Sequence, residues 1–102
     1  MMYTTLGRSG LRVSRIGLGT SGFGTNGERA YAFGFDRAEP IVRRALELGI
    51  NFFDSAEQYS AGTSEEVLGQ CLKACDVRRE DVVVATVLGS VPVQIKPRVW
   101  LL

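Results

Sequence analysis

The fold is decided by one stretch in the middle of the chain, which reads Gly49-Ile50-Asn51-Phe52-Phe53-Asp54-Ser55-Ala56-Glu57-Gln58-Tyr59. Its apolar run, residues 50–53, is typical of a buried strand, and the carboxylate of Asp54 stands where that strand should end. The phenol of Tyr59 follows in the loop. In a parallel barrel the carboxyl ends of the strands carry the catalytic groups. An acid and a phenol on that rim therefore predict acid–base chemistry on a carbonyl group.

Outward from this stretch, strand and helix patterns alternate along the chain. Alternating units of this kind predict a parallel α/β architecture. The loop before the first helix is long for a compact domain, which points to a functional or mobile segment. In chain order we expect a hairpin at 3–13 with its turn at 7–10, a strand at 16–18, a loop at 21–35, a helix at 36–48, the strand at 50–53, a helix at 63–75 and a strand at 81–86.

Both predicted helices carry start signals and one carries a stop signal. Asp36 predicts an N-cap, with Glu39 completing a capping box, and Gly49 predicts the end of that helix. Thr63 or Ser64 predicts the N-cap of the second helix. The buried faces are expected to consist of Ile41, Val42, Ala45, Leu46 and Leu48 in the first helix, and of Val67, Leu68, Cys71, Leu72 and Cys75 in the second.

Length and composition limit what the chain can hold. Its 102 residues are 45% hydrophobic and 23% charged, with a formal net charge of +1, as in a globular protein. A closed eight-stranded barrel needs about 250 residues, so only part of one fits here. No basic patch suggests nucleic acid, and no apolar run reaches the roughly 20 residues that cross a bilayer. The start of the chain lacks the pattern of a signal peptide, so we expect a cytoplasmic protein.

Two sequence features leave alternatives open. Cys71 and Cys75 lie on one face of a predicted helix, and a zinc site would need four ligands although the chain has no His. They are either reduced thiols on a partly buried face or redox-active. Gly17, Gly19 and Gly22 match G-x-G-x-x-G, but a Rossmann site needs a helix directly after that turn. A tight strand exit and a pliable loop explain these glycines better.

Three stretches resemble the aldo/keto reductases in the order and spacing of that family. Together they cover roughly residues 3–86. The resemblance implies an incomplete (β/α)₈ TIM-type barrel over residues 1–88, and an NADP(H)-dependent oxidoreductase that interconverts a small-molecule carbonyl and alcohol by hydride transfer. The three stretches are the hairpin and first strand, Leu6-Gly7-Arg8-Ser9-Gly10-Leu11-Arg12-Val13-Ser14-Arg15-Ile16-Gly17-Leu18-Gly19-Thr20; the quoted stretch 49–59; and the helix residues Gly62, Ser64, Glu65, Glu66, Leu68 and Gly69.

The same resemblance implies the roles of the site residues. Asp54 and Tyr59 correspond to catalytic residues, while Gly19, Thr20 and Asp54 would bind the nicotinamide end of NADP. Tyr59 would give a proton to the carbonyl oxygen, and a phenol with an ordinary pKa near 10 needs a neighbouring cation for that. A lysine after the third strand provides it in the family, whereas Thr86 is followed here by Val87. Without the resemblance, Asp54 would be a rim residue capping backbone amides, and Tyr59 an aromatic covering a loop.

The end of the chain departs from the family. Residues 89–102 resemble no family segment, so we expect a non-family tail, explained by a frameshift, an altered splice or a truncation. The histidine that the family places on its fourth strand is also missing. We therefore expect an enzyme by ancestry whose isolated chain is inactive, or a non-catalytic barrel fragment or regulatory protein of the same fold. An unpaired last strand also predicts a marginally stable domain.

Overall fold

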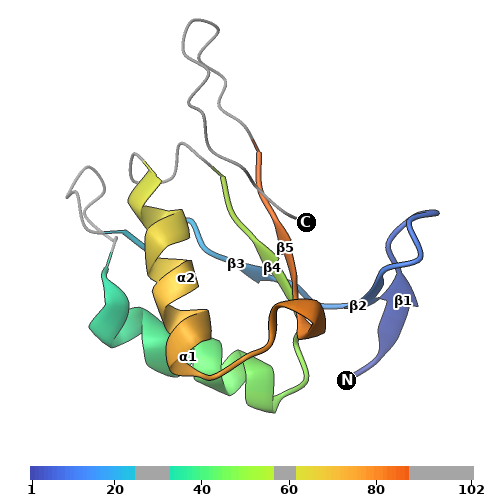
Figure 1. Cartoon of the computed structure of the whole chain (residues 1–102), viewed down its shortest axis with the longest axis horizontal. Helices are drawn as coiled ribbons and strands as arrows, with labels where there is room; N and C mark the ends of the chain where they lie inside the picture. Colours follow the sequence, from blue (N-terminus) through green and yellow to red (C-terminus); the bar gives the residue numbers. More distant parts are fainter. Residues whose placement is uncertain (25–32, 57–61, 88–102) are drawn as a thin grey trace, which may run out of the picture.

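Figure 1 presents the computed structural model of the chain, which describes residues 1–24, 33–56 and 62–87. Tyr59 and the predicted tail lie outside the described residues. The described elements are, in chain order, β1 (Tyr3–Thr5), β2 (Arg12–Ser14), β3 (Leu18–Gly19), α1 (Phe35–Glu47), β4 (Phe52–Asp54), α2 (Thr63–Ala74), the 3₁₀ turn η2 (Arg79–Asp81) and β5 (Val83–Ala85).

A three-stranded parallel sheet forms the centre of the described chain, in the order β3-β4-β5. The strand order follows the chain order, and α1 and α2 lie together on one face of the sheet (Figure 1). The wall of a (β/α)₈ barrel has this arrangement, whereas a doubly wound Rossmann fold has helices on both faces. The predicted α/β architecture is therefore confirmed, and the sheet is consistent with part of a barrel.

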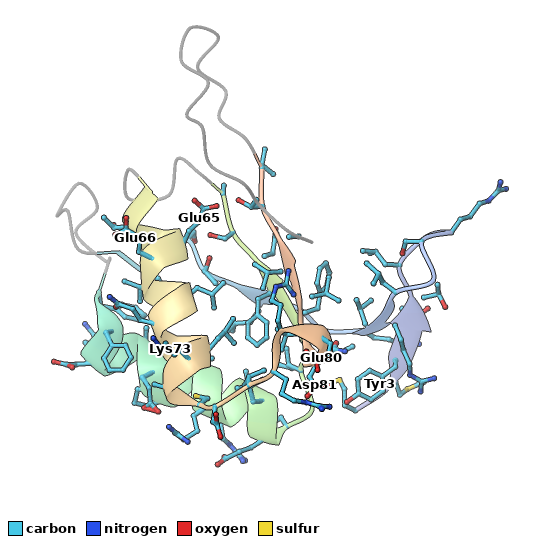
Figure 2. All side chains as sticks on the ribbon, in the orientation of Figure 1. Tyr3, Glu65, Glu66, Lys73, Glu80 and Asp81 are labelled. Carbon is cyan, nitrogen blue, oxygen red and sulfur yellow. The ribbon has the colours of Figure 1, made fainter. Side chains whose placement is uncertain are left out.

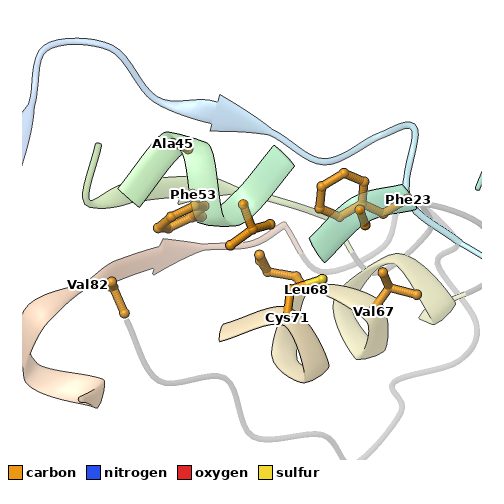
Figure 3. Close-up of a cluster of buried hydrophobic side chains, with 9 residues drawn as sticks. Phe23, Ala45, Phe53, Val67, Leu68, Cys71 and Val82 are labelled. Atoms are coloured by element: carbon orange, nitrogen blue, oxygen red, sulfur yellow. The ribbon is translucent and has the colours of Figure 1, made fainter. Parts of the chain in front are cut away.

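The hydrophobic core lies between this sheet and the two helices (Figure 3). Phe53 is fully buried at its centre, because it is the β4 residue that points toward the helices. Burying a Phe side chain stabilises a fold by roughly 1.5–3 kcal/mol relative to leaving it exposed, which makes this residue a main anchor of the sheet. The cluster comprises Phe23, Ala38, Val42, Ala45, Phe53, Val67, Leu68, Cys71 and Val82.

The antiparallel hairpin β1-β2 is attached to the amino end of the sheet (Figure 1). The Asn51 side chain accepts a hydrogen bond from the Ser14 N–H at 2.7 Å and donates one to the Arg12 carbonyl at 3.0 Å. The Tyr3 hydroxyl donates to the Gly49 carbonyl at 2.7 Å. These three bonds join the hairpin to the residues that lead into β4.

Both predicted N-caps are wrong. Helix α1 begins at Phe35 after Gly34, and α2 begins at Thr63 after Gly62, in each case without a side-chain capping bond. Asp36 therefore lies in the first turn of α1. Gly62 takes a left-handed φ of 93°, a conformation that glycine adopts at no steric cost. Because neither helix start uses a side-chain capping bond, the polar side chains in the first turns can make other contacts.

Other predicted boundaries and faces need smaller corrections. The strands are shorter than expected and shifted by one or two residues, while Gly49 ends the α1 region with a left-handed φ of 91° as predicted. Ile41 and Leu48, expected in the core, are 40% and 50% exposed, because the buried face of α1 turns toward Ala38 instead. Within the described ranges, every helix is too short or too polar to span a bilayer.

Candidate active site

Asp54 ends β4 at the carboxyl edge of the sheet, as the sequence predicted. Its register partners are Gly19 in β3 and Ala85 in β5. Successive side chains of a strand alternate between the two faces, and Phe53 points into the core. The side chain of Asp54 therefore projects from the face opposite the helices, where it is exposed.

The surface next to this carboxylate is open. A Cβ atom placed on Gly19 would meet no atom within 4 Å. Gly19 thus leaves free space beside Asp54 on the face of the sheet without helices. In a complete barrel this face would line the interior, and ligands bind at its carboxyl rim, where Asp54 lies.

Hydroxyl residues stand directly after each of the three strands: Thr20, Ser55 and Thr86. Thr20 is fully buried and donates to the Asp54 carbonyl twice, from its N–H at 3.0 Å and from Oγ1 at 3.1 Å. The Ser55 N–H donates to the Ala85 carbonyl at 2.8 Å. The backbone on each side of the Asp54 side chain is thereby fixed to a neighbouring strand.

The first turn of α2 contacts the same edge. Ser64 Oγ donates to the Thr20 carbonyl at 2.6 Å, and Thr86 Oγ1 donates to Glu65 Oε2 at 2.6 Å. Figure 2 shows Glu65 at the start of α2, beside the ends of the strands. Sequence reasoning predicted Ser64 only as a helix cap and gave Glu65 no site role. The pattern of a hydroxyl and an acid in a first turn does not reveal contacts to strands far along the chain.

Thr20 thus lies where the sequence placed it, but its polar groups are engaged inside the protein. Its N–H and Oγ1 bind Asp54, and its carbonyl accepts the hydrogen bond from Ser64. Its predicted cofactor contact stays a prediction. Tyr59 lies outside the described residues, so its catalytic role stays a prediction as well.

Position 87 follows the end of β5, at the same edge of the sheet as Asp54. Ala85, the register partner of Asp54, is the last residue of β5, and residue 87 lies two residues further along the chain. If the strand alternation continued past Ala85, it would return residue 87 to the Asp54 face. The side chain there is valine, and it is 62% exposed. A lysine at this position could extend its ammonium toward the carboxylate, whereas valine offers only methyl groups.

The cysteines belong to the core rather than to this edge. Cys71 is fully buried, and this burial raises the pKa of its thiol to about 11. Cys75 is half-buried, and burial also raises the pKa of its thiol, although Arg43 partly opposes the shift. Among the residues that the structure describes, no cluster of His, Cys, Asp or Glu could hold a metal ion. The burial of the two thiols and their raised pKa values favour structural thiols over redox-active ones.

A groove of about 630 Å³ lies at the other end of the strands, between the hairpin and the turn before β5. It includes Tyr3, Asn51 and Asp81 among its lining residues and does not contain Asp54. Two of its charged side chains, Arg78 and Asp81, pair with each other, at 3.0 Å between Nε and Oδ2. The position of this groove therefore does not coincide with that of the candidate active-site residue Asp54.

A parallel sheet in chain order, with helices on one face and a carboxylate at the carboxyl edge, defines part of an α/β barrel. The aldo/keto reductase family model matches residues 15–99. The chain belongs to the aldo/keto reductase family, an oxidoreductase lineage. The matched range runs past residue 88, and the domain boundary placed there from the sequence stays a prediction.

Individual relatives agree with this assignment. The chain is 45% identical over 87 residues to L-galactose dehydrogenase of Arabidopsis thaliana, covering 82% of this chain and 25% of that protein. It is 41% identical over 88 residues to a probable voltage-gated potassium channel subunit beta of Oryza sativa, covering 86% and 25%. The chain thus spans about a quarter of the length of these relatives.

Solved structures show the same partial overlap. A thermostable aldo-keto reductase bound to the inhibitor epalrestat superposes with a TM-score of 0.69 at 31% identity, over 86% of this chain and 31% of that one. The holo form of an aldo-keto reductase from Bacillus halodurans gives 0.68 at 37% identity, over 84% and 25%. The three described parallel strands therefore correspond to part of a complete barrel.

Proposed function

We propose that this chain is the first part of an NADP(H)-dependent aldo/keto reductase barrel that acts on a small carbonyl or alcohol, and that the 102-residue chain is inactive by itself. Asp54 and Tyr59 are its inherited catalytic residues. The observation that carries the proposed inactivity is the side chain at position 87, an exposed valine two residues after the register partner of Asp54. We further propose a cytoplasmic location.

The chemistry explains why that position matters. A phenol with an ordinary pKa near 10 transfers its proton slowly at neutral pH unless a nearby cation stabilises the phenolate. A carboxylate can hold such a cation by an ion pair, and Asp54 is exposed at the right edge for it. With Val87 in place, Asp54 has no ammonium at this position to hold for Tyr59. The proton transfer that Tyr59 would perform is therefore slow in this chain.

Gly19 and Asp54 are the described residues that fit the nicotinamide end of the cofactor, because both border the open face. The cofactor, when bound, supplies the hydride. Thr20 supports the Asp54 backbone from the helix side, through two hydrogen bonds to its carbonyl oxygen. In this proposal Thr20 acts on the cofactor site through Asp54.

Two assays on the 102-residue chain test the proposal. A titration followed by NADPH fluorescence measures cofactor binding, and a coupled carbonyl-reduction assay measures turnover, with Tyr59→Phe as the control. We expect neither saturable binding nor turnover. Reduction that disappears in the Tyr59→Phe variant would contradict the proposed inactivity.

A second candidate is a non-catalytic barrel fragment or a regulatory protein of the same fold. Val87 favours it as well, and one relative is named as a channel subunit. This alternative predicts stable association with a second barrel chain, which native mass spectrometry detects. A chain that stays monomeric in the presence of other barrel chains would count against it.

A further inference from the structure

We propose that the first turn of α2 is a clamp that sets the positions of the two strand ends flanking Asp54. Ser64 and Glu65 are its positioning residues. The clamp matters for catalysis only if the proposed function holds, but its geometry can be tested without cofactor or turnover.

The first arm of the clamp holds the end of β3. Ser64 is fully buried, and its hydroxyl donates to the Thr20 carbonyl at 2.6 Å and lies 3.3 Å from Thr20 Oγ1. Thr20 in turn donates twice to the Asp54 carbonyl. A continuous hydrogen-bond chain thus runs from α2 through β3 to the backbone of the site residue. Linked bonds of this kind strengthen one another in a buried setting.

The second arm holds the end of β5. Thr86 Oγ1 donates to Glu65 Oε2 at 2.6 Å, a hydrogen bond to a carboxylate and therefore among the stronger kinds. Thr86 stands between Ala85, whose carbonyl accepts the Ser55 N–H, and position 87. Glu65 therefore holds the chain directly after β5, beside the carbonyl that binds Ser55.

Helix geometry explains how two consecutive residues serve two strands. Neighbouring side chains diverge by about 100° around a helix, so Ser64 and Glu65 can reach strands on opposite sides of β4. The helix needs neither residue for its own start, because Gly62 forms the N-cap without a side-chain bond. Glu66, the next residue, is exposed and has no such contact to either strand end among those described.

Amide hydrogen exchange on the 102-residue chain, followed by NMR, tests the clamp. The reporters at the carboxyl edge are the N–H groups of Thr20 and Ser55; the reporter at the other end is the Val83 N–H, which binds the Asn51 carbonyl at 2.8 Å. We expect Ser64→Ala to speed exchange at Thr20 about fivefold or more, because a buried carbonyl loses its partner. We expect Thr86→Val to speed exchange of the Ser55 N–H by the same factor. Exchange at Val83 should change less than about twofold in both variants.

Conservative variants and a neighbouring control complete the design. Thr86→Ser keeps the donor and Glu65→Gln keeps an acceptor, so both should preserve slow exchange at Ser55, and Glu66→Ala should change nothing. Equal acceleration at both ends of the strands would show a general stabilising role and overturn the proposal. So would unchanged exchange at the edge, or unprotected amides throughout the unmodified chain. None of these results depends on NADPH, so they are distinct from a failure of the proposed function.

Discussion

At the scale of single residues, the two thiols differ in how far the fold suppresses their reactivity. Burial raises the pKa of Cys71 to about 11 from the ordinary value of 9.0. Only the thiolate reacts with alkylating reagents. A raised pKa lowers the thiolate fraction at any pH below it, so the folded chain protects Cys71 in the mildly alkaline range.

We therefore predict slow alkylation of Cys71 by iodoacetamide at pH 9, measured by mass spectrometry in a Cys75→Ser variant. Burial withholds the Cys71 thiol from the reagent and raises its pKa, so the rate in native buffer should be at least about tenfold below the rate in urea. The rate should rise steadily between pH 9 and 11. Equal rates in buffer and in urea would show that Cys71 is not held in the core.

At the scale of elements, the hairpin depends on one amide side chain. Asn51 binds Ser14 and Arg12 of β2, and Ser14 is almost fully buried. Asn51→Ala leaves a buried N–H and a carbonyl without these partners, which costs about 1–3 kcal/mol. We predict that trypsin then cleaves after Arg12 and Arg15 at least about fivefold faster, because the hairpin opens more often.

The matched control for this prediction is Ser9→Ala. Ser9 lies in the hairpin turn and makes only local bonds, to Leu6 and Leu11. Cleavage in this variant should stay close to that of the unmodified chain. If Asn51→Ala leaves the cleavage rate unchanged, the amide does not hold the hairpin to β4.

The elements also show how far the sequence could predict the site. Asp54 and Gly49 were placed correctly, because an apolar run ending in an acid and a glycine at a helix end are local signals. The predicted N-caps at Asp36 and Ser64 are wrong, because the N-cap positions are occupied by Gly34 and Gly62, which make no side-chain capping bond. The Ser64 hydroxyl binds Thr20, 44 residues away. A contact between residues so far apart in the sequence cannot be predicted from the local spacing of residue types.

At the scale of the whole molecule, the described sheet presents one face to helices and leaves Asp54 exposed on the other. A complete barrel would cover that face with the remaining strands. We keep the prediction that the isolated chain is marginally stable. A broad thermal transition that begins just above room temperature would fit it, and a sharp cooperative melt of the monomer at a higher temperature would contradict it.

The central claim is that valine at position 87, in place of a lysine, makes proton transfer by Tyr59 slow. A chimera with a complete barrel tests this claim separately from the effect of the short chain. Residues 1–88 of this chain replace the aligned quarter of Arabidopsis L-galactose dehydrogenase, once with Val87 and once with Val87→Lys. Oxidation of L-galactose by the two folded proteins is then compared. We predict turnover in the lysine form and at least about 100-fold less in the valine form, because the proton transfer loses its cation. Equal turnover in both forms would contradict the claim.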